Sequence, residues 1–222
     1  MLAVVTSAAL APAAARASLH PTLSAEGWTH GEYDGLRPAS FHPHPQGIAV
    51  EAQGTGSFVW KRMRGEAGCL GWRWRVDAGP PATLLTRRGG DDRALAITAG
   101  FAGWPPRVTA WQRAQHAIAQ VAAGRHVLPR SVLIYVWGGT GQEPDFFPSP
   151  WIPGIGCVRV LRPAGSPQGR WFEERVDLAA DWRRAFGGEP PPLQEIAIGT
   201  DGDDTGTRIS AMVEAIRHTG CG

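Results

Sequence analysis

The sequence contains no block of lysine and arginine residues, no C-x-x-C pair, and no G-x-S-x-G or Walker motif. The missing basic block, together with a formal net charge of +2, argues against a nucleic-acid partner. The other absences argue against thiol redox chemistry, a serine hydrolase and a nucleotide-binding enzyme. The seven histidines are scattered, so the three or four converging ligands that zinc needs are not expected.

Beyond the N-terminal run, no apolar stretch approaches the ~18 residues that a membrane-spanning helix needs, so we expect no stable membrane span. Residues 1–17, MLAVVTSAALAPAAARA, are rich in alanine and end in an A-x-A sequence. A short apolar run closed by such a site is typical of a secretory signal peptide, although no Lys or Arg precedes the run here. We therefore expect a periplasmic or secreted protein in which residues 18–222 form a single domain.

Glycine and proline are abundant, at 29 and 19 of 222 residues, whereas there are three cysteines. The turn-forming residues leave little room for long helices and favour short strands joined by turns. Cys69, Cys157 and Cys221 can form one disulfide, which leaves one thiol over. Cys157 begins an apolar run and is expected in the core. One disulfide and three unpaired cysteines remain open as alternatives.

Several segments alternate apolar and polar residues with the period of two that half-buried strands have. In the segment from Trp72 to Asp77, one face holds two tryptophans and a valine and the other holds charged residues. Residues 132–137 are apolar on both faces and are expected to form a central strand covered from both sides. Further strands are expected at 48–52, 95–101, 158–162, 170–176 and 195–199. The pattern predicts an all-β fold, a jelly-roll-like β-sandwich with one or two short inserted helices.

The helices are expected at 109–123, where Gly124 marks the end, and at 177–186, where Asp177 can cap the start. The segment 209–216 is ambiguous, because its apolar residues fit the helical and the strand period equally. Its alanine, methionine and glutamate favour a helix by local propensity.

Five stretches in order carry a resemblance to a known family: LGWRWRVDAGPP, GGDDRALAI, VLIYVWGG, GRWFEERVDLAADWRRAFGGEPP and LQEIAIGTDGDDTG. Together, over roughly residues 70–216, they resemble the bacterial exported proteins catalogued as domain of unknown function 3047. The resemblance implies a jelly-roll sandwich similar to carbohydrate-binding modules, and it implies no activity. It also implies a β-strand for the ambiguous segment 209–216.

The acidic turn near the C-terminus is the best candidate site. Asp201, Asp203 and Asp204 place three carboxylates within four residues, and closely spaced carboxylates are suitable ligands for hard cations such as Ca²⁺. Asp91 and Asp92 can join this turn in space, because loops gather at the ends of a sandwich. The alternatives are a ligand-contacting loop, a solvated turn without function, and local ion pairs between the Asp pair and neighbouring arginines. The cofactor is thus expected to be either Ca²⁺ or none.

A second group of residues is considered for ligand binding. Arg73 and Arg75 lie on one strand face and can bind a carboxylate or an acidic sugar, or can pair with acids across the sheet. Among the ten tryptophans, those in Gly- and Pro-rich loops are candidates for exposed platforms on which a sugar can stack: Trp104, Trp151 and Trp28. Two aromatic residues of the central strand can line a concave face if that strand is not wholly covered: Tyr135 and Trp137.

These features predict an exported, non-catalytic binding module for a glycan or another cell-envelope polymer, with a polysaccharide as the expected partner. One alternative is a carbohydrate-active enzyme on the same fold. A glycoside hydrolase needs two carboxylates at a defined separation, for which Glu173 with Asp201 is a candidate pair. A polysaccharide lyase needs a base beside an arginine, for which Tyr135 with Arg73 or Arg75 is the candidate set. The other alternative is a structural or accessory envelope protein without a small ligand.

Overall fold

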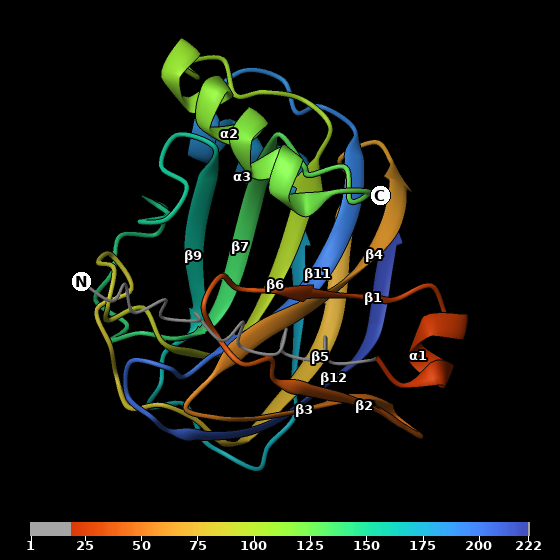
Figure 1. The fold of residues 1–222 in the computed structure, drawn as a ribbon, viewed down its shortest axis with the longest axis vertical. Helices are drawn as coiled ribbons and strands as arrows, with labels where there is room; N and C mark the ends of the chain where they lie inside the picture. The colour runs from red at the N-terminus through yellow and green to blue at the C-terminus, as the bar shows by residue number, and fades with distance from the viewer. Residues whose placement is uncertain (1–18, 222) are drawn as a thin grey trace, which may run out of the picture.

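The computed structural model describes residues 19–221, so the signal peptide predicted at 1–17 lies outside the described residues. The described chain forms two β-sheets that pack face to face, with one short helix before the first strand and helices in two of the connections (Figure 1). The predicted jelly-roll-like β-sandwich is therefore confirmed. None of the helices in this part of the chain is long and apolar enough to cross a membrane.

The larger sheet has seven strands in the order β1-β4-β11-β6-β7-β9-β8. All neighbours in it are antiparallel except β7 and β9, which are parallel. The strand bounds are β1 Thr29–Glu32, β4 Gly56–Gly65, β11 Leu193–Asp201, β6 Arg93–Phe101, β7 Ser131–Gly138, β9 Gly156–Arg162 and β8 Phe147–Pro148.

The smaller sheet has five antiparallel strands in the order β10-β5-β12-β3-β2. Their bounds are β10 Phe172–Asp177, β5 Cys69–Ala78, β12 Arg208–Thr219, β3 Gly47–Gln53 and β2 Ser40–His44.

The core between the two sheets is rich in aromatic side chains, and the inward face of β5 supplies Trp72 and Trp74 as the alternation predicts. Their rings meet edge to face at 5.4 Å. Strand β7 is covered on both faces, as expected, because a second apolar cluster lies on its outer side. That cluster consists of Leu85, Ala96, Val136, Phe147 and Val158.

Both predicted helices are present at one end of the sandwich (Figure 1). Helix α2, Ala110–Ala123, begins with a capping box between Thr109 and Gln112. Helix α3, Leu178–Phe186, is capped by the carboxylate of Asp177, which accepts hydrogen bonds from two backbone N–H groups of the first turn. A third, five-residue helix, α1 at Pro21–Ala25, was not expected.

The ambiguous segment 209–216 is part of strand β12, as the family resemblance implies. Its helical propensity is overridden because β12 lies between β5 and β3 and forms backbone hydrogen bonds to both. The pairing shifts by one residue between Glu214 and Arg217, which marks a β-bulge. Inside the bulge, Ala215 has a φ of 52°, the left-handed region that non-glycine residues rarely occupy.

Of the two cysteine alternatives, the structure has the disulfide, between Cys69 at the start of β5 and Cys221. It links the end of the smaller sheet to the segment that follows β12. Cys157 is a free, buried thiol in the core, as its apolar surroundings predict, and burial raises its pKa to about 11.

Candidate functional site

Sheet pairing brings the two acidic segments together. Strands β6 and β11 are antiparallel neighbours, so the start of β6 lies beside the end of β11, where Arg93 pairs with Asp201. Asp91 and Asp92 precede β6, and the acidic turn follows β11. This end of the sandwich lies away from α2, because α2 follows the opposite end of β6.

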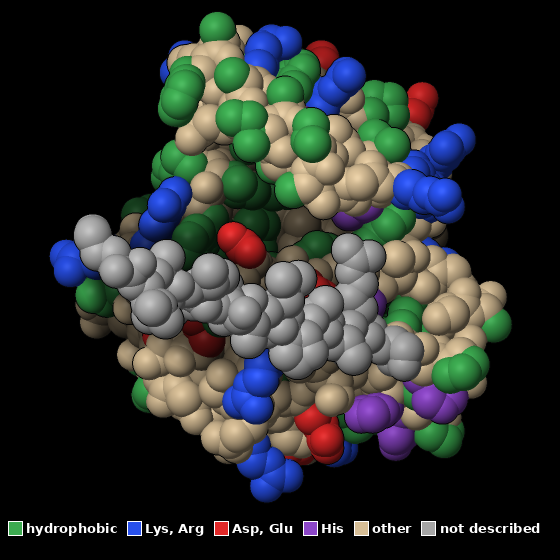
Figure 2. All heavy atoms as spheres, in the orientation of Figure 1, with side chains coloured by type: hydrophobic (Ala, Val, Ile, Leu, Met, Phe, Trp, Pro, Cys, Tyr) green, Lys and Arg blue, Asp and Glu red, His purple; other side chains and the backbone are tan. Residues whose placement is uncertain are grey.

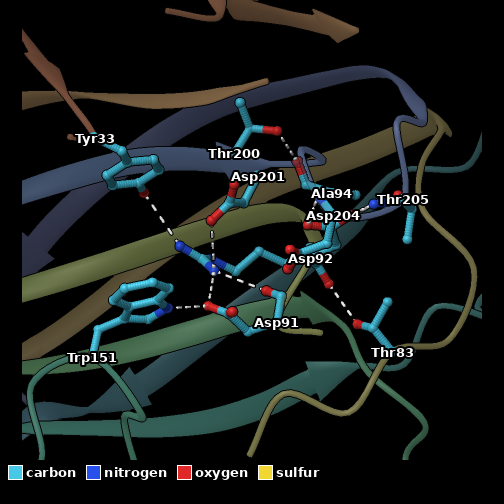
Figure 3. Close-up of polar contacts among 11 residues, drawn as sticks. Tyr33, Thr83, Asp91, Asp92, Ala94, Trp151, Thr200, Asp201, Asp204 and Thr205 are labelled. Atoms are coloured by element: carbon cyan, nitrogen blue, oxygen red, sulfur yellow. Dashed lines mark hydrogen bonds and ion pairs between the residues drawn. The ribbon is translucent and has the colours of Figure 1, made fainter. Parts of the chain in front are cut away.

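Asp92 holds the acidic turn in place. Its carboxylate is almost fully buried and accepts hydrogen bonds from Asp204 N at 3.3 Å, from Thr205 N at 2.8 Å and from the Thr205 hydroxyl at 2.6 Å (Figure 3). The hydroxyl of Thr83 donates to the Asp92 carbonyl oxygen at 2.7 Å. The structure therefore places Asp92 against the turn that the sequence identified.

Arg93 lies at the centre of the neighbouring polar cluster. Its Nη1 atom is 3.2 Å from Asp201 Oδ2 and 3.4 Å from Asp91 Oδ2, and it also donates to the Asp91 carbonyl oxygen at 2.9 Å. Its Nη2 atom donates to the hydroxyl of Tyr33 at 3.3 Å. Figure 3 shows Tyr33, Asp91 and Asp201 gathered at this point. The two carboxylates thus share one guanidinium group.

Asp201 is incompletely satisfied. Only 8% of the residue is exposed, and its Oδ1 atom has no hydrogen-bond partner among the described residues. Burial raises the pKa of Asp201 to about 7; Arg93 opposes this shift, and the nearby carboxylates of Asp203 and Asp91 add to it. An added Cβ at Gly56 would lie 2.5 Å from Asp201 Oδ1, so glycine at that position leaves room for the carboxylate.

Three carboxylates form the candidate ligand set of the site. One oxygen each from Asp92, Asp201 and Asp203 lies within 4.8 Å of the others. Two ligands that each lie about 2.4 Å from one Ca²⁺ ion are at most about 4.8 Å apart, so this spacing fits a single ion. Asp204 lies beside the set, is exposed and is not one of the three; burial and then the charge of Asp203 raise its pKa.

Trp151, one of the predicted loop platforms, lies next to this cluster. Its Nε1 atom donates a 2.6 Å hydrogen bond to Asp91 Oδ2 (Figure 3). The guanidinium of Arg88 lies 4.8 Å from the Trp151 ring centroid. The residue is nevertheless 56% exposed. A tryptophan that is fixed at its polar edge and exposed over much of its surface can serve as a platform for an apolar ligand face.

The other two loop tryptophans are less accessible. Trp104 is half-buried and is surrounded by the guanidinium groups of Arg113 and Arg130, at 5.1 and 5.8 Å, and by the ring of His116. Trp28 is buried, so the expectation that it forms an exposed platform is wrong.

The predicted arginine pair lies on the outer face of the smaller sheet, away from the acidic cluster. Arg73 forms a 2.6 Å ion pair with Glu214 across the sheet, and Arg75 pairs with Asp77 at 2.9 Å. Both guanidinium groups pack on the ring of Trp171, at 5.2 and 5.6 Å. Each arginine therefore already has an acidic partner on the sheet, which leaves only part of its hydrogen-bonding capacity for a ligand.

The expectation that Tyr135 and Trp137 line an open concave face is wrong. Both side chains point into the core from β7, and at most 1% of each residue is exposed. Tyr135 donates a 2.9 Å hydrogen bond to Asp181, and burial holds its pKa well above the usual value. Its burial also removes it as the base of the lyase alternative with Arg73 or Arg75.

The proposed hydrolase pair of Glu173 with Asp201 is also wrong as a cross-strand pair. Glu173 is in β10, which pairs with β5 in the smaller sheet, whereas Asp201 ends β11 in the larger sheet. The two residues therefore lie in different layers of the sandwich.

A histidine–carboxylate pair on the outer side of the larger sheet was missed. His126 Nε2 lies 2.9 Å from Glu195, which is buried, and the imidazole stacks on the ring of Trp60 at 3.8 Å. Residues 126 and 195 are far apart in sequence, and nothing in the sequence around either one points to the other. Tyr33 was missed for the same reason.

Figure 2 shows that the surface is hollowed over β6 and β7, with hydrophobic side chains at the base of the hollow.

A family model described as "Protein of unknown function (DUF3047)" matches residues 27–217. A search of curated proteins found no match. Among solved structures, the chain is similar to the family 11 xylanase from Neocallimastix patriciarum, with 10% identity, a TM-score of 0.39, and coverage of 86% of this chain and 94% of that chain. Nothing about activity follows from a likeness of this size.

Proposed function

Because the chain belongs to the DUF3047 family of proteins of unknown function, its own residues must indicate its role, and we propose that it is a non-catalytic binding module for a glycan or another extracellular polymer. We further propose that a divalent cation organises the binding loops. The carboxylate oxygens of the site are ligands that suit Ca²⁺. The observation that carries the proposal is the exposed ring of Trp151, tied through Asp91 to a cluster of converging carboxylates.

Charge supports the cation. Arg93 compensates Asp91 and Asp201, but Asp92 and Asp203 form no salt bridge within residues 19–221. Ca²⁺ prefers six to eight oxygen ligands, and carboxylates that converge from flexible loops supply them. The unpartnered Oδ1 of Asp201 is an available ligand atom in this set. Backbone carbonyl groups, hydroxyls and water would complete the coordination.

The aromatic ring supports the polymer ligand. Sugars present apolar C–H faces that stack on aromatic rings, and a ring that is already fixed loses little conformational entropy on binding. Trp151 is fixed by its bond to Asp91 and by its contact with Arg88. A cation that orders the loop of Asp91 and Asp92 would therefore also order the binding surface.

The disulfide supports an extracellular or periplasmic location. Disulfides persist in oxidising compartments and are rare in the cytosol of most organisms. The bond between Cys69 and Cys221 agrees with the export that residues 1–17 predict.

The cation is tested by metal analysis of the purified protein and by thermal unfolding in Ca²⁺ and in EDTA. An ion that binds only the folded state raises the melting temperature, by an amount that grows with its concentration. Asp203→Asn should abolish this increase, and Glu51→Gln, an exposed acid on the other sheet, should retain it. Equal melting temperatures in Ca²⁺ and EDTA would disprove the cation.

The ligand is tested by binding assays against a panel of neutral and acidic polysaccharides. Trp151→Ala should weaken binding, while Trp111→Ala should not, because Trp111 is equally a tryptophan and 69% exposed but lies on α2. Loss of binding in both variants, or in neither, contradicts the assignment of Trp151. A folded protein that binds no polymer in Ca²⁺ contradicts the proposed function.

A further inference from the structure

A groove crosses the outer face of the smaller sheet, near the end where β10 leads into α3. Its volume is about 340 Å³, which is at the lower end of the range for small-ligand pockets (~300–1,000 Å³). It is lined from three adjacent strands, and its central residue is Gly71 of β5.

The sheet register arranges charged residues around Gly71 in two rows. In one row, Arg175 of β10 and Arg217 of β12 lie on either side of Gly71. In the next row, Glu173 and Glu214 lie on either side of Arg73. Neighbouring strands are about 4.8 Å apart, so the backbones of the two flanking arginines are about 10 Å apart and both side chains can reach one anion above Gly71.

The two flanking arginines are available for a ligand. Both are exposed, and neither forms a salt bridge within residues 19–221, whereas Arg73 is bound to Glu214 at 2.6 Å. An added Cβ at Gly71 would have one neighbour within 4 Å, the carbonyl oxygen of Glu174 at 3.5 Å. Space above the glycine is therefore open, and its missing side chain forms the floor of the groove.

The β-bulge in β12 is what places the second arginine here. From Glu214 to Arg217 the strand advances three residues, while its partner β5 advances two, from Arg73 to Gly71. Without the extra residue, Ile216 would lie opposite Gly71. The bulge holds Ala215 in a left-handed conformation that is strained for a non-glycine residue, and bulges that redirect a side chain are characteristic of functional positions.

We propose that this groove binds the carboxylate of a sugar acid between Arg175 and Arg217. Two guanidinium groups suit a carboxylate, which they can bind with charge-assisted hydrogen bonds. Glu173 and Thr219 also line the groove and can accept hydrogen bonds from sugar hydroxyls. A hydroxylated carboxylate uses both kinds of group, whereas a bare inorganic anion has no hydroxyl to donate to Glu173 or Thr219 and uses the arginines alone.

The proposal does not depend on the cation or on Trp151, which belong to the larger sheet. The experiment is a calorimetric or NMR titration with galacturonate, galactose and sulfate, performed in EDTA so that a failure of the cation site cannot affect it. Galactose differs from galacturonate by a hydroxymethyl group in place of the carboxylate. We expect galacturonate to bind, and galactose and sulfate to bind at least tenfold more weakly.

Arg175→Gln and Arg217→Gln should each weaken galacturonate binding roughly tenfold or more, the loss expected for a charge-assisted hydrogen bond. Arg208→Gln, an exposed arginine at the other end of β12, should leave it unchanged. Gly71→Val fills the floor and should abolish binding, and near-UV circular dichroism checks that each variant is folded. The proposal would be overturned if galacturonate and galactose bound equally, or if sulfate bound as tightly as galacturonate. Unchanged galacturonate affinity in both Arg variants would overturn it too.

Discussion

The indole N–H of Trp151 donates its hydrogen bond to the same Asp91 oxygen, Oδ2, that faces the guanidinium of Arg93. The exposed ring and the buried ion-pair cluster are therefore one connected unit. A change at the carboxylates reaches the surface through Asp91, and a change at the ring leaves a buried carboxylate with one partner fewer.

Trp151→Phe separates the anchoring of the ring from its stacking. Phenylalanine keeps an aromatic face but cannot donate to Asp91, so the ring becomes free to change rotamer. Immobilising such a side chain costs about 0.5–1.5 kcal/mol, and we expect polysaccharide affinity to fall roughly two- to tenfold, less than in Trp151→Ala. Affinity measurements of both variants on one polysaccharide check this order. An affinity of Trp151→Phe equal to that of the wild type would show that the hydrogen bond has no role in binding.

The metal-free protein should lose stability as the pH rises from about 4 to about 7. The pKa of Asp201 is about 7 in the folded state, while an unfolded aspartate has a pKa of about 3.9. Between these values the folded state keeps a proton that the unfolded state has lost, so the free energy of unfolding decreases with pH, by at most about 4 kcal/mol. Urea unfolding in EDTA at several pH values measures this decrease.

Asp201→Asn is the control for that pH dependence. The amide does not titrate, so the variant should show a flatter curve over the same pH range, whatever its absolute stability. Ca²⁺ should flatten the wild-type curve too, because a bound ion keeps the carboxylate ionised. Parallel curves for the wild type and Asp201→Asn in EDTA would contradict the raised pKa.

Breaking the disulfide should lower the free energy of unfolding by about 2–5 kcal/mol, since Cys69 and Cys221 are 152 residues apart and close a long loop. Urea unfolding of Cys69→Ser against the wild type measures the effect. Cys157→Ser serves as the comparison for losing a buried thiol that has no partner. If a reducing agent lowers the stability of Cys69→Ser as much as that of the wild type, the disulfide is not the cause.

Ala215→Gly should preserve or raise stability, by up to about 1.5 kcal/mol. Glycine removes the Cβ clash of the left-handed conformation, worth about 1–2 kcal/mol, and costs about 0.5–1 kcal/mol in backbone entropy. Ala215→Val should lower stability, because a branched side chain tolerates this conformation least. Thermal unfolding of the two variants gives the comparison. A loss of stability in Ala215→Gly as large as that in Ala215→Val would argue against strain at this position.

The sequence predicted those strands and helices whose alternation or capping residues are visible within the element itself. Strand β5 alternates cleanly, and α3 has a capping Asp177 and a terminal Gly187. Strand β4 was missed, although it is ten residues long, because it is buried on both faces at its start and basic at its end, so no alternation is visible. The edge strands β1 and β2 and the two-residue β8 were missed because they are short and carry few apolar residues.

The register between strands could not be predicted, and it decides the sites. The sequence suggested that Asp91 and Asp92 can join the acidic turn, but the pairing of β6 with β11 is what brings Asp92 and Asp201 together and places Arg93 between Asp91 and Asp201. The groove likewise depends on the pairing of β5 with both β10 and β12 around Gly71. Local propensity favoured a helix for the segment that forms β12, because the two strands that hydrogen-bond to it are distant in sequence.

The position of β12 also has a consequence for folding during synthesis. This strand, Arg208–Thr219, lies between β5 and β3, which are made more than a hundred residues earlier. While the ribosome is still adding the intervening residues, those two strands have no partner between them, and the smaller sheet cannot close. The smaller sheet therefore cannot be completed until translation has passed residue 219.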